Sequence, residues 1–141
     1  MIDISHLHPL TVHFPIALIL TGLIFDIVSF FRKDDLFYSR AGLYLIVLGS
    51  IGALLGYLTG EFFTKELKGE AGELKELHEF FAKASMFILL VVSVFRIYII
   101  YKPLNIKNIR LAILGVEFIG AISLGIAGYL GGSLVYNYLI K

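Results

Sequence analysis

The sequence predicts an all-α protein that crosses a membrane four times as an up-down-up-down helical bundle. Hydrophobic residues make up 58% of the 141 residues and charged residues 16%, whereas a soluble domain has about 45–50% apolar and about 25% charged residues. The apolar residues also fall into four separate runs, each near the ~20 residues that a helix needs to cross a bilayer. These two observations place the chain in the membrane class as a single domain.

The four predicted spans are almost free of Lys and Arg in their interiors, and two of the three connections between them are short. The middle connection, residues 61–79, is longer and charged, with Leu and Phe at helical spacing interrupted by Gly69 and Gly72. We expect it to be an amphipathic segment at the interface that leads into the third span. The spans cover roughly residues 10–31, 41–59, 80–101 and 111–130.

Charge predicts the orientation of the chain. Cytoplasmic short loops carry an excess of Lys and Arg. The short connections and their flanks hold seven basic residues and the opposite side five. This bias favours short connections in the cytoplasm and both termini in the periplasm, with the chain in the cytoplasmic membrane. The seven are Arg32, Lys33, Arg40, Arg96, Lys102, Lys107 and Arg110, and the five are Lys65, Lys68, Lys75, Lys83 and Lys141.

Composition also excludes several classes of function. The chain has no cysteine, so disulfides, Cys-ligated iron–sulfur clusters and covalent c-type haem are ruled out. A net charge of +1 gives no reason to expect nucleic acid as a partner. The first residues lack the positive charge of a signal peptide, so we expect the first span to direct insertion. No nucleophile–base or nucleotide motif is present, and we expect no independent catalytic activity.

All four histidines lie at the predicted outer end: His6, His8 and His13 at the start of the first span and His78 at the start of the third. A single interfacial histidine is more often a polar anchor than a ligand, and His6 is expected to be solvated. Two histidines at one depth on different spans favour a ligand site. Because spans one and three are diagonal in such a bundle, two imidazoles could take both axial positions of a b-type haem.

Within the first span we expect His13, paired with His78, to bind the metal. Pro9 suits the first helical position, which needs no N–H group, and this sets His13 about one turn inside the helix. Pro15 removes a backbone donor, so this turn is loosened. His8 lies five residues before His13, about 140° around a helix, and is expected to support the bound cofactor or to be a ligand at the rim of the site.

Glycines concentrate on the two spans without histidine. Eleven of the fourteen lie on the second and fourth spans and their ends, and the third span has none. Close helix packing is one interpretation of such small residues, and room for a porphyrin is the other. The candidate wall of the haem site is Gly52, Gly56 and Gly60 on the second span with Gly128, Gly131 and Gly132 on the fourth.

Two carboxylates, Asp26 and Glu117, lie inside the apolar runs towards the opposite end. Acidic residues within spans are candidates for function. Because both lie within about two turns of an end, snorkelling to the interface or pairing with Arg96 or Arg110 is the simpler expectation. A proton path or a quinone site is the alternative.

The opening stretch HPLTVHFPIA (residues 8–17) and the closing stretch GGSLVY (residues 131–136) give the chain a resemblance to a family of small four-helix bacterial membrane proteins, domain of unknown function 2231. The resemblance covers essentially the whole chain. Members often follow the closing motif with His-Gly, whereas this chain continues Asn137-Tyr138, so any role of that later histidine is absent. Similar domains joined to Rieske or cytochrome c domains imply redox work. The matching positions are His8, Pro9, His13, Pro15, His78, Gly131 and Gly132.

Three functions follow from these observations. The first is a b-type haem carrier that relays electrons between a quinol or a membrane redox complex and a periplasmic redox protein. The second is a cofactor-free accessory subunit of a respiratory complex, which the small size and apolar surface suit. The third is a metal-ion site or small transporter in which the outer histidines bind zinc or copper, disfavoured by the lack of cysteine and nearby carboxylates. The oligomeric state stays open, a homo-oligomer included.

Overall fold

The computed structural model describes residues 7–64, 67–101 and 106–139, with the side chains of 11–62, 64, 67–101 and 108–138. Four long helices dominate it. They are α1 (Leu7–Phe31), α2 (Leu36–Phe63), α3 (Glu70–Tyr101) and α4 (Ile106–Leu134), and a π-helical turn, η2 (Val135–Leu139), continues α4. The all-α four-helix architecture that the sequence predicts is confirmed.

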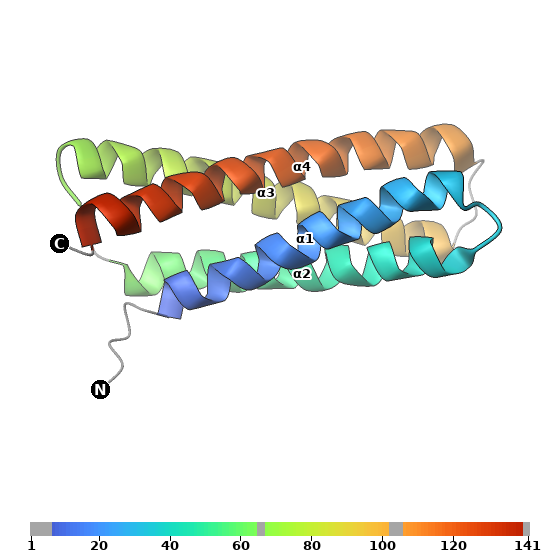
Figure 1. The fold of residues 1–141 in the computed structure, drawn as a ribbon, viewed down its shortest axis with the longest axis horizontal. Helices are drawn as coiled ribbons and strands as arrows, with labels where there is room; N and C mark the ends of the chain where they lie inside the picture. The colour runs from blue at the N-terminus through green and yellow to red at the C-terminus, as the bar shows by residue number, and fades with distance from the viewer. Residues whose placement is uncertain (1–6, 65–66, 102–105, 140–141) are drawn as a thin grey trace.

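The helices run alternately up and down along one long axis (Figure 1). The start of α1, the end of α4 and the α2–α3 connection lie at one end, which we call the histidine end, and the α1–α2 connection lies at the other, the short-loop end. Packing is most extensive between α1 and α2 and between α3 and α4, while α2 also contacts α3 and α1 contacts α4. Among the described residues, α1 and α3 therefore face each other diagonally across the bundle.

All four helices begin before the predicted spans, α1 by three residues, α2 and α4 by five and α3 by ten. Helix α1 begins at Leu7 rather than at Pro9, but Pro9 remains in the first turn, where backbone N–H groups have no helical acceptor. Helix α3 begins at Glu70 and runs without a break to Tyr101. The charged residues 70–79 are thus the first turns of α3 and continue directly into the third span. Gly69, with φ of 64°, marks the turn before α3, a conformation that glycine adopts readily.

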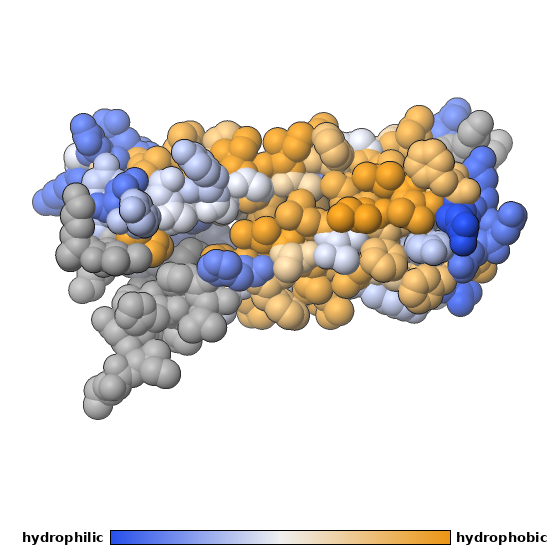
Figure 2. Space-filling model, viewed as in Figure 1, coloured by the Kyte–Doolittle hydropathy of each residue, from blue (hydrophilic) through white to orange (hydrophobic). Residues whose placement is uncertain are grey.

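The surface is apolar where the helices are long enough to cross a bilayer. Figure 2 shows a hydrophobic belt between two polar ends, and four helices within the described residues have the length and composition of membrane spans. Large side chains such as Phe14, Phe87 and Tyr129 are mostly exposed. A chain with this belt places its apolar side chains in lipid, which makes exposure favourable rather than costly.

The interior combines an apolar cluster with small polar groups. Ile19, Ile46 and Leu89 are fully buried at the centre. Ser50 on α2 and Ser93 on α3 are also buried, with their hydroxyl oxygens 2.9 Å apart. Hydrogen bonds of this kind join membrane helices, because lipid gives no hydrophobic driving force between them.

Glycine brings α1 and α2 into close contact. A Cβ atom on Gly22 would lie 2.9 Å from Cδ1 of Ile46, and one on Gly49 would lie 2.6 Å from Cδ1 of Ile19. Each helix thus offers a glycine to an isoleucine of its partner. The small-residue interpretation of the α2 glycines as a packing surface holds for this helix pair.

Candidate functional site

A cavity of about 390 Å³ lies between the helices at the histidine end. Its volume falls within the range of roughly 300–1,000 Å³ that is usual for small-molecule sites. All four helices contribute to its wall, which is mainly apolar. Residues that line it include Val12, Ile16, Ala53, Tyr57, Ser85, Leu124, Val135 and Tyr136, together with both described histidine side chains.

His13 and His78 line this one cavity from α1 and α3. His13 is exposed and His78 is half-buried, so the His13 part of the wall is reachable from outside the bundle. His8 lies in α1, but its side chain falls outside the described side chains, and His6 falls outside the described residues. The structure thus brings together the pair that the sequence analysis favoured.

The imidazole of His78 is held by α4. Its Nδ1 atom lies 2.8 Å from the carbonyl oxygen of Ala127. A carbonyl oxygen only accepts, so Nδ1 carries the hydrogen and donates it. In the neutral ring the lone pair is then on Nε2. Histidines that bind metals are usually held by such a hydrogen bond from their other ring nitrogen.

The glycines of α4 make room for this ring. A Cβ on Gly131 would lie 3.0 Å from Cε1 and 3.2 Å from Nδ1 of His78, and one on Gly128 would lie 3.1 Å from Cδ1 of Ile16. A Cβ on Gly132 would meet no atom within 4 Å. All three glycines line the cavity. Of the closing glycine pair, Gly131 lies against the imidazole of His78 and Gly132 borders open space.

The α2 glycines act differently along the helix. Gly56 lines the cavity, and its added Cβ would lie 3.4 Å from Val12. Gly52 packs against Pro15, 3.3 Å from its Cβ. The carbonyl of Gly60 accepts hydrogen bonds from the backbone N–H and the hydroxyl of Thr64, which ends α2. The cavity lining thus includes Gly56 but neither Gly52 nor Gly60.

Sequence reasoning missed most contributors to the cavity, among them Ala127, Tyr57 and Tyr136. The Ala127 carbonyl is a backbone atom and has no sequence signal. Tyr57 and Tyr136 read as ordinary aromatic residues, although Tyr136 lies in the closing motif. The π-helical turn that carries Val135 and Tyr136 also has no sequence signal, because helical periodicity does not distinguish π from α geometry over one turn. Such turns occur frequently at functional sites.

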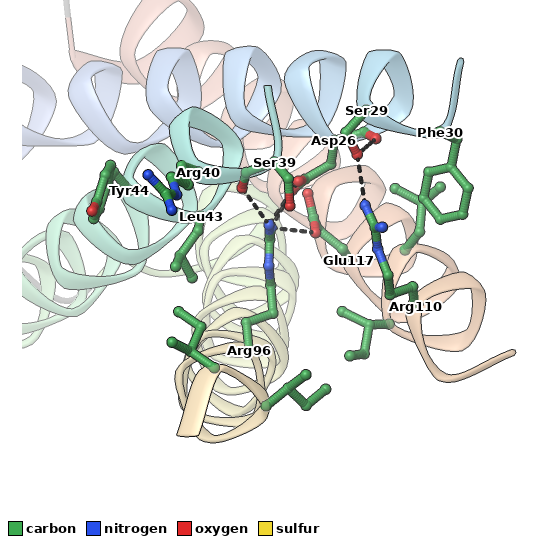
Figure 3. Close-up of a pocket in the computed structure, with 14 residues that line it drawn as sticks. Asp26, Ser29, Phe30, Ser39, Arg40, Leu43, Tyr44, Arg96, Arg110 and Glu117 are labelled. Carbon is green, nitrogen blue, oxygen red and sulfur yellow. Dashed lines mark hydrogen bonds and ion pairs between the residues drawn. The ribbon is translucent and has the colours of Figure 1, made fainter. Parts of the chain in front are cut away.

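A second polar site lies at the short-loop end, where Figure 3 shows Arg96 reaching from α3 towards α1 and α4. Both terminal nitrogens of its guanidinium donate to the carboxylate of Asp26, Nη1 to Oδ2 and Nη2 to Oδ1 at 2.7 Å. Nη1 also donates to Oε2 of Glu117 at 3.3 Å, and Nη2 to the carbonyl of Ser39 at 3.2 Å. Of the two arginines that the sequence predicts as partners, Arg96 pairs with both carboxylates.

Arg110 takes part at the edge of this second site. It donates to the hydroxyl of Ser29 at 3.2 Å, and its guanidinium lies 5.3 Å from the centre of the Phe30 ring. A cavity of about 480 Å³ adjoins the cluster and has Asp26, Arg96 and Glu117 in its wall. In the parts of the chain that the structure describes, no group of three or more His, Asp or Glu side chains is placed to hold a metal ion.

These features define the class of protein as a four-helix integral membrane protein with a polar site towards each end of the bundle. The chain belongs to the family described as "Predicted membrane protein (DUF2231)", whose model matches residues 5–141. The family resemblance is therefore confirmed. No curated protein and no solved structure matches the chain significantly.

Proposed function

We propose that this membrane protein binds a b-type haem between His13 and His78 and carries electrons. The observation that supports the proposal is the presence of both imidazoles, from diagonal helices, in the wall of one cavity. Bis-histidine sites in helical bundles are built from side chains on facing helices in this way. When bound, haem would supply a one-electron redox centre whose potential depends on its axial ligands and surroundings.

The donor set fits this ligand. The hydrogen bond from Nδ1 of His78 to Ala127 fixes the ring and leaves Nε2 as the coordinating nitrogen. Gly131 leaves space that a Cβ would take from this ring. The mainly apolar wall would lower the local dielectric around the ligand, one of the means by which a protein tunes a redox centre. His13, being exposed, gives an edge through which a partner could exchange electrons.

The partners of the proposed carrier follow from orientation. Because the short-loop end has the larger number of basic residues in short connections, we place it in the cytoplasm and the histidine end in the periplasm of a cytoplasmic membrane. A quinol or a membrane redox complex would then donate electrons, and a periplasmic redox protein would accept them. The adjacent Lys83, 5.6 Å from the centre of the Tyr57 ring, adds positive charge beside the cavity.

Optical spectroscopy tests the proposal. The full chain is expressed with haem supplied, purified in mild detergent, and examined by reduced-minus-oxidised difference spectra. We expect a b-type signal in the wild-type protein and its loss in His13→Ala and in His78→Ala. The control is His6→Ala, which we expect to retain the signal because the sequence predicts a solvated His6. Circular dichroism and gel filtration of each variant report folding separately.

The other outcomes decide between the alternatives. A haem signal that persists in both His13→Ala and His78→Ala would show that the assigned ligands are wrong. Stoichiometric zinc or copper without haem would favour a metal-ion site. A stable complex with a larger respiratory assembly, with no chromophore in this chain, would favour the accessory-subunit function.

A further inference from the structure

At the short-loop end, two carboxyl groups share one guanidinium. Arg96 aligns both of its terminal nitrogens with Asp26, whereas Glu117 receives only the 3.3 Å contact from Nη1. Both carboxyl groups therefore meet at a single nitrogen atom. If both were ionised, these three side chains would carry one excess negative charge in the interior of the bundle.

Glu117 is the more deeply buried carboxyl group and the less well paired. The residue is 1% exposed, and its Oε1 atom has no hydrogen-bond partner among the described residues. An ionised carboxylate needs several donors when it leaves water, and an unpaired buried charge is far more costly than a neutral carboxyl group. The surroundings of Glu117 thus suit a neutral acid.

The carboxylate of Asp26, in contrast, is closely surrounded by groups that fit it. Besides the paired guanidinium, Gly42 of α2 lies directly against its carboxylate, and a Cβ at that position would overlap the carboxylate oxygens. Asp26 is therefore the ion-pair partner of Arg96. A negative charge on Glu117 would have no cation paired with it alone.

The other cations in the described cavity wall give neither carboxyl group a hydrogen bond. Arg110 lies near enough to Asp26 for its charge to act on that carboxylate, but its guanidinium donates to Ser29 and lies over Phe30, and Arg40 is exposed at the surface. The titratable and charged side chains in the cavity wall are Asp26 from α1, Arg40 and Tyr44 from α2, Arg96 from α3, and Arg110 and Glu117 from α4.

We propose that Asp26 and Glu117 form a proton-binding site within the membrane, in which one exchangeable proton resides on the Glu117 carboxyl group. Uptake is balanced: a hydronium ion in the cavity transfers a proton to the Glu117 carboxylate, leaving a carboxylic acid and water, and Arg96 stays a cation. The 480 Å³ cavity provides the route for water from the short-loop end. The site stands independently of haem at the other end.

A proton suits this place better than another cation. Glu117 is 1% exposed and its Oε1 atom is buried, so this carboxylate cannot present both oxygens to a sodium ion in the cavity. The Arg96 guanidinium also occupies the position between the carboxyl groups that a metal cation would take. A proton requires no added volume.

Infrared difference spectroscopy of the purified full chain, without added haem, tests the site. We expect the carbonyl band of a protonated carboxylic acid at neutral pH, a shift of that band in D₂O, and its loss at high pH while the protein remains folded. The band should disappear in Glu117→Gln. The control is Glu61→Gln, which changes an exposed glutamate at the end of α2 and should leave the band unchanged.

Several outcomes would overturn the proposal. One is the absence of the band in the folded wild-type protein at every pH, a result that depends on no variant. Another is a band that persists in Glu117→Gln but disappears in Asp26→Asn. A third is a band that responds to replacement of potassium by sodium at constant pH, which would assign the site to a metal cation.

Discussion

The Nδ1 atom of His78 lies 2.8 Å from the carbonyl oxygen of Ala127, so a hydrogen bond joins α3 to α4 at the wall of the cavity. This contact fixes which ring nitrogen carries the proton and therefore which one can bind a metal. It depends on Gly131, because the ring lies where a larger residue would place its Cβ. The closing Gly-Gly pair and His78 thus form one structural unit.

Replacing Gly131 by Ala should disturb this unit. The new Cβ would lie 3.0 Å from Cε1 of His78, so the ring must shift and its hydrogen bond weaken. We expect a loss of about 1 kcal/mol in the free energy of unfolding, the usual contribution of one hydrogen bond, and a weaker haem signal. Denaturation in detergent micelles measures the first effect and difference spectra the second.

Gly125→Ala is the matched control for that change. It lies on the same helix, is exposed, and its added Cβ would meet no atom within 4 Å. We expect it to leave both the stability and the haem signal unchanged or slightly improved, since Ala is the better helix former. Equal effects of the two substitutions would contradict the role given to Gly131.

Gly132→Ala tests whether the ligand occupies the cavity itself. Gly132 lines the cavity, and its added Cβ would meet no protein atom within 4 Å. We expect unchanged stability of the ligand-free protein and weaker binding in a haem titration, because the methyl group would take space from the ligand alone. Unchanged haem affinity would locate the haem elsewhere.

Much of the histidine site could be predicted from the sequence, because it depends on how deep each residue lies along its helix. His13 and His78 lie near the starts of two helices that run in the same direction, so span assignment alone places them at one end. The pairing of Asp26 and Glu117 with Arg96 follows from the same logic, since an unpaired charge inside a span is unfavourable. The depth of a residue within its span and the charge of its side chain can both be predicted from a single sequence.

Rotation about the helix axis was harder to predict. The stripe Gly52, Gly56 and Gly60 reads as one surface, yet Gly52 packs against Pro15 and Gly56 also borders the cavity. Which neighbour a glycine meets depends on how α1 crosses α2, a tertiary property. The same is true of the unpartnered Oε1 of Glu117, which depends on where the Arg96 fork is directed.

The close contact of α1 and α2 predicts a second stability effect. In Gly49→Ala the Cβ would lie 2.6 Å from Cδ1 and 3.3 Å from the backbone nitrogen of Ile19. Because backbone cannot rotate away, the helices must separate, and overpacking of this kind costs about 1–3 kcal/mol. Chemical denaturation in micelles measures it. Gly115→Ala, where the Cβ meets no atom within 4 Å, is the control, and a similar loss there would exclude the packing explanation.

The Ser50–Ser93 contact predicts a modest coupling between α2 and α3. Interhelical hydrogen bonds in membranes contribute about 0.6 kcal/mol on average and at most about 1.7. Ser50 also donates to the carbonyl of Ile46 at 2.7 Å, so the Ser50→Ala change alone overstates the pair. A double-mutant cycle with Ser93→Ala isolates the coupling. Additive effects of the two substitutions would mean that the 2.9 Å contact contributes nothing to stability.

Removing the cation from the second site should have the largest effect. Arg96→Gln leaves Asp26 and Glu117 without their shared partner, and breaking a buried ion pair typically costs about 3–5 kcal/mol. Arg96→Lys should recover part of this, because an ammonium group keeps the charge but not the two-pronged geometry. The free energy of unfolding in micelles is the measurement. Arg32→Gln, an exposed change, should stay within about 0.5 kcal/mol of wild type.

Combining Arg96→Gln with Asp26→Asn distinguishes the loss of charge balance from the loss of the arginine's packing. Asp26 receives the two best-aligned bonds of Arg96, so neutralising it should restore more stability to Arg96→Gln than the Glu117→Gln change does. Glu117 contributes less because a neutral acid leaves little charge for Arg96 to balance. If Glu117→Gln restored more than Asp26→Asn, Glu117 would be the ionised partner of Arg96, and the distribution of charge inferred from the geometry would be reversed.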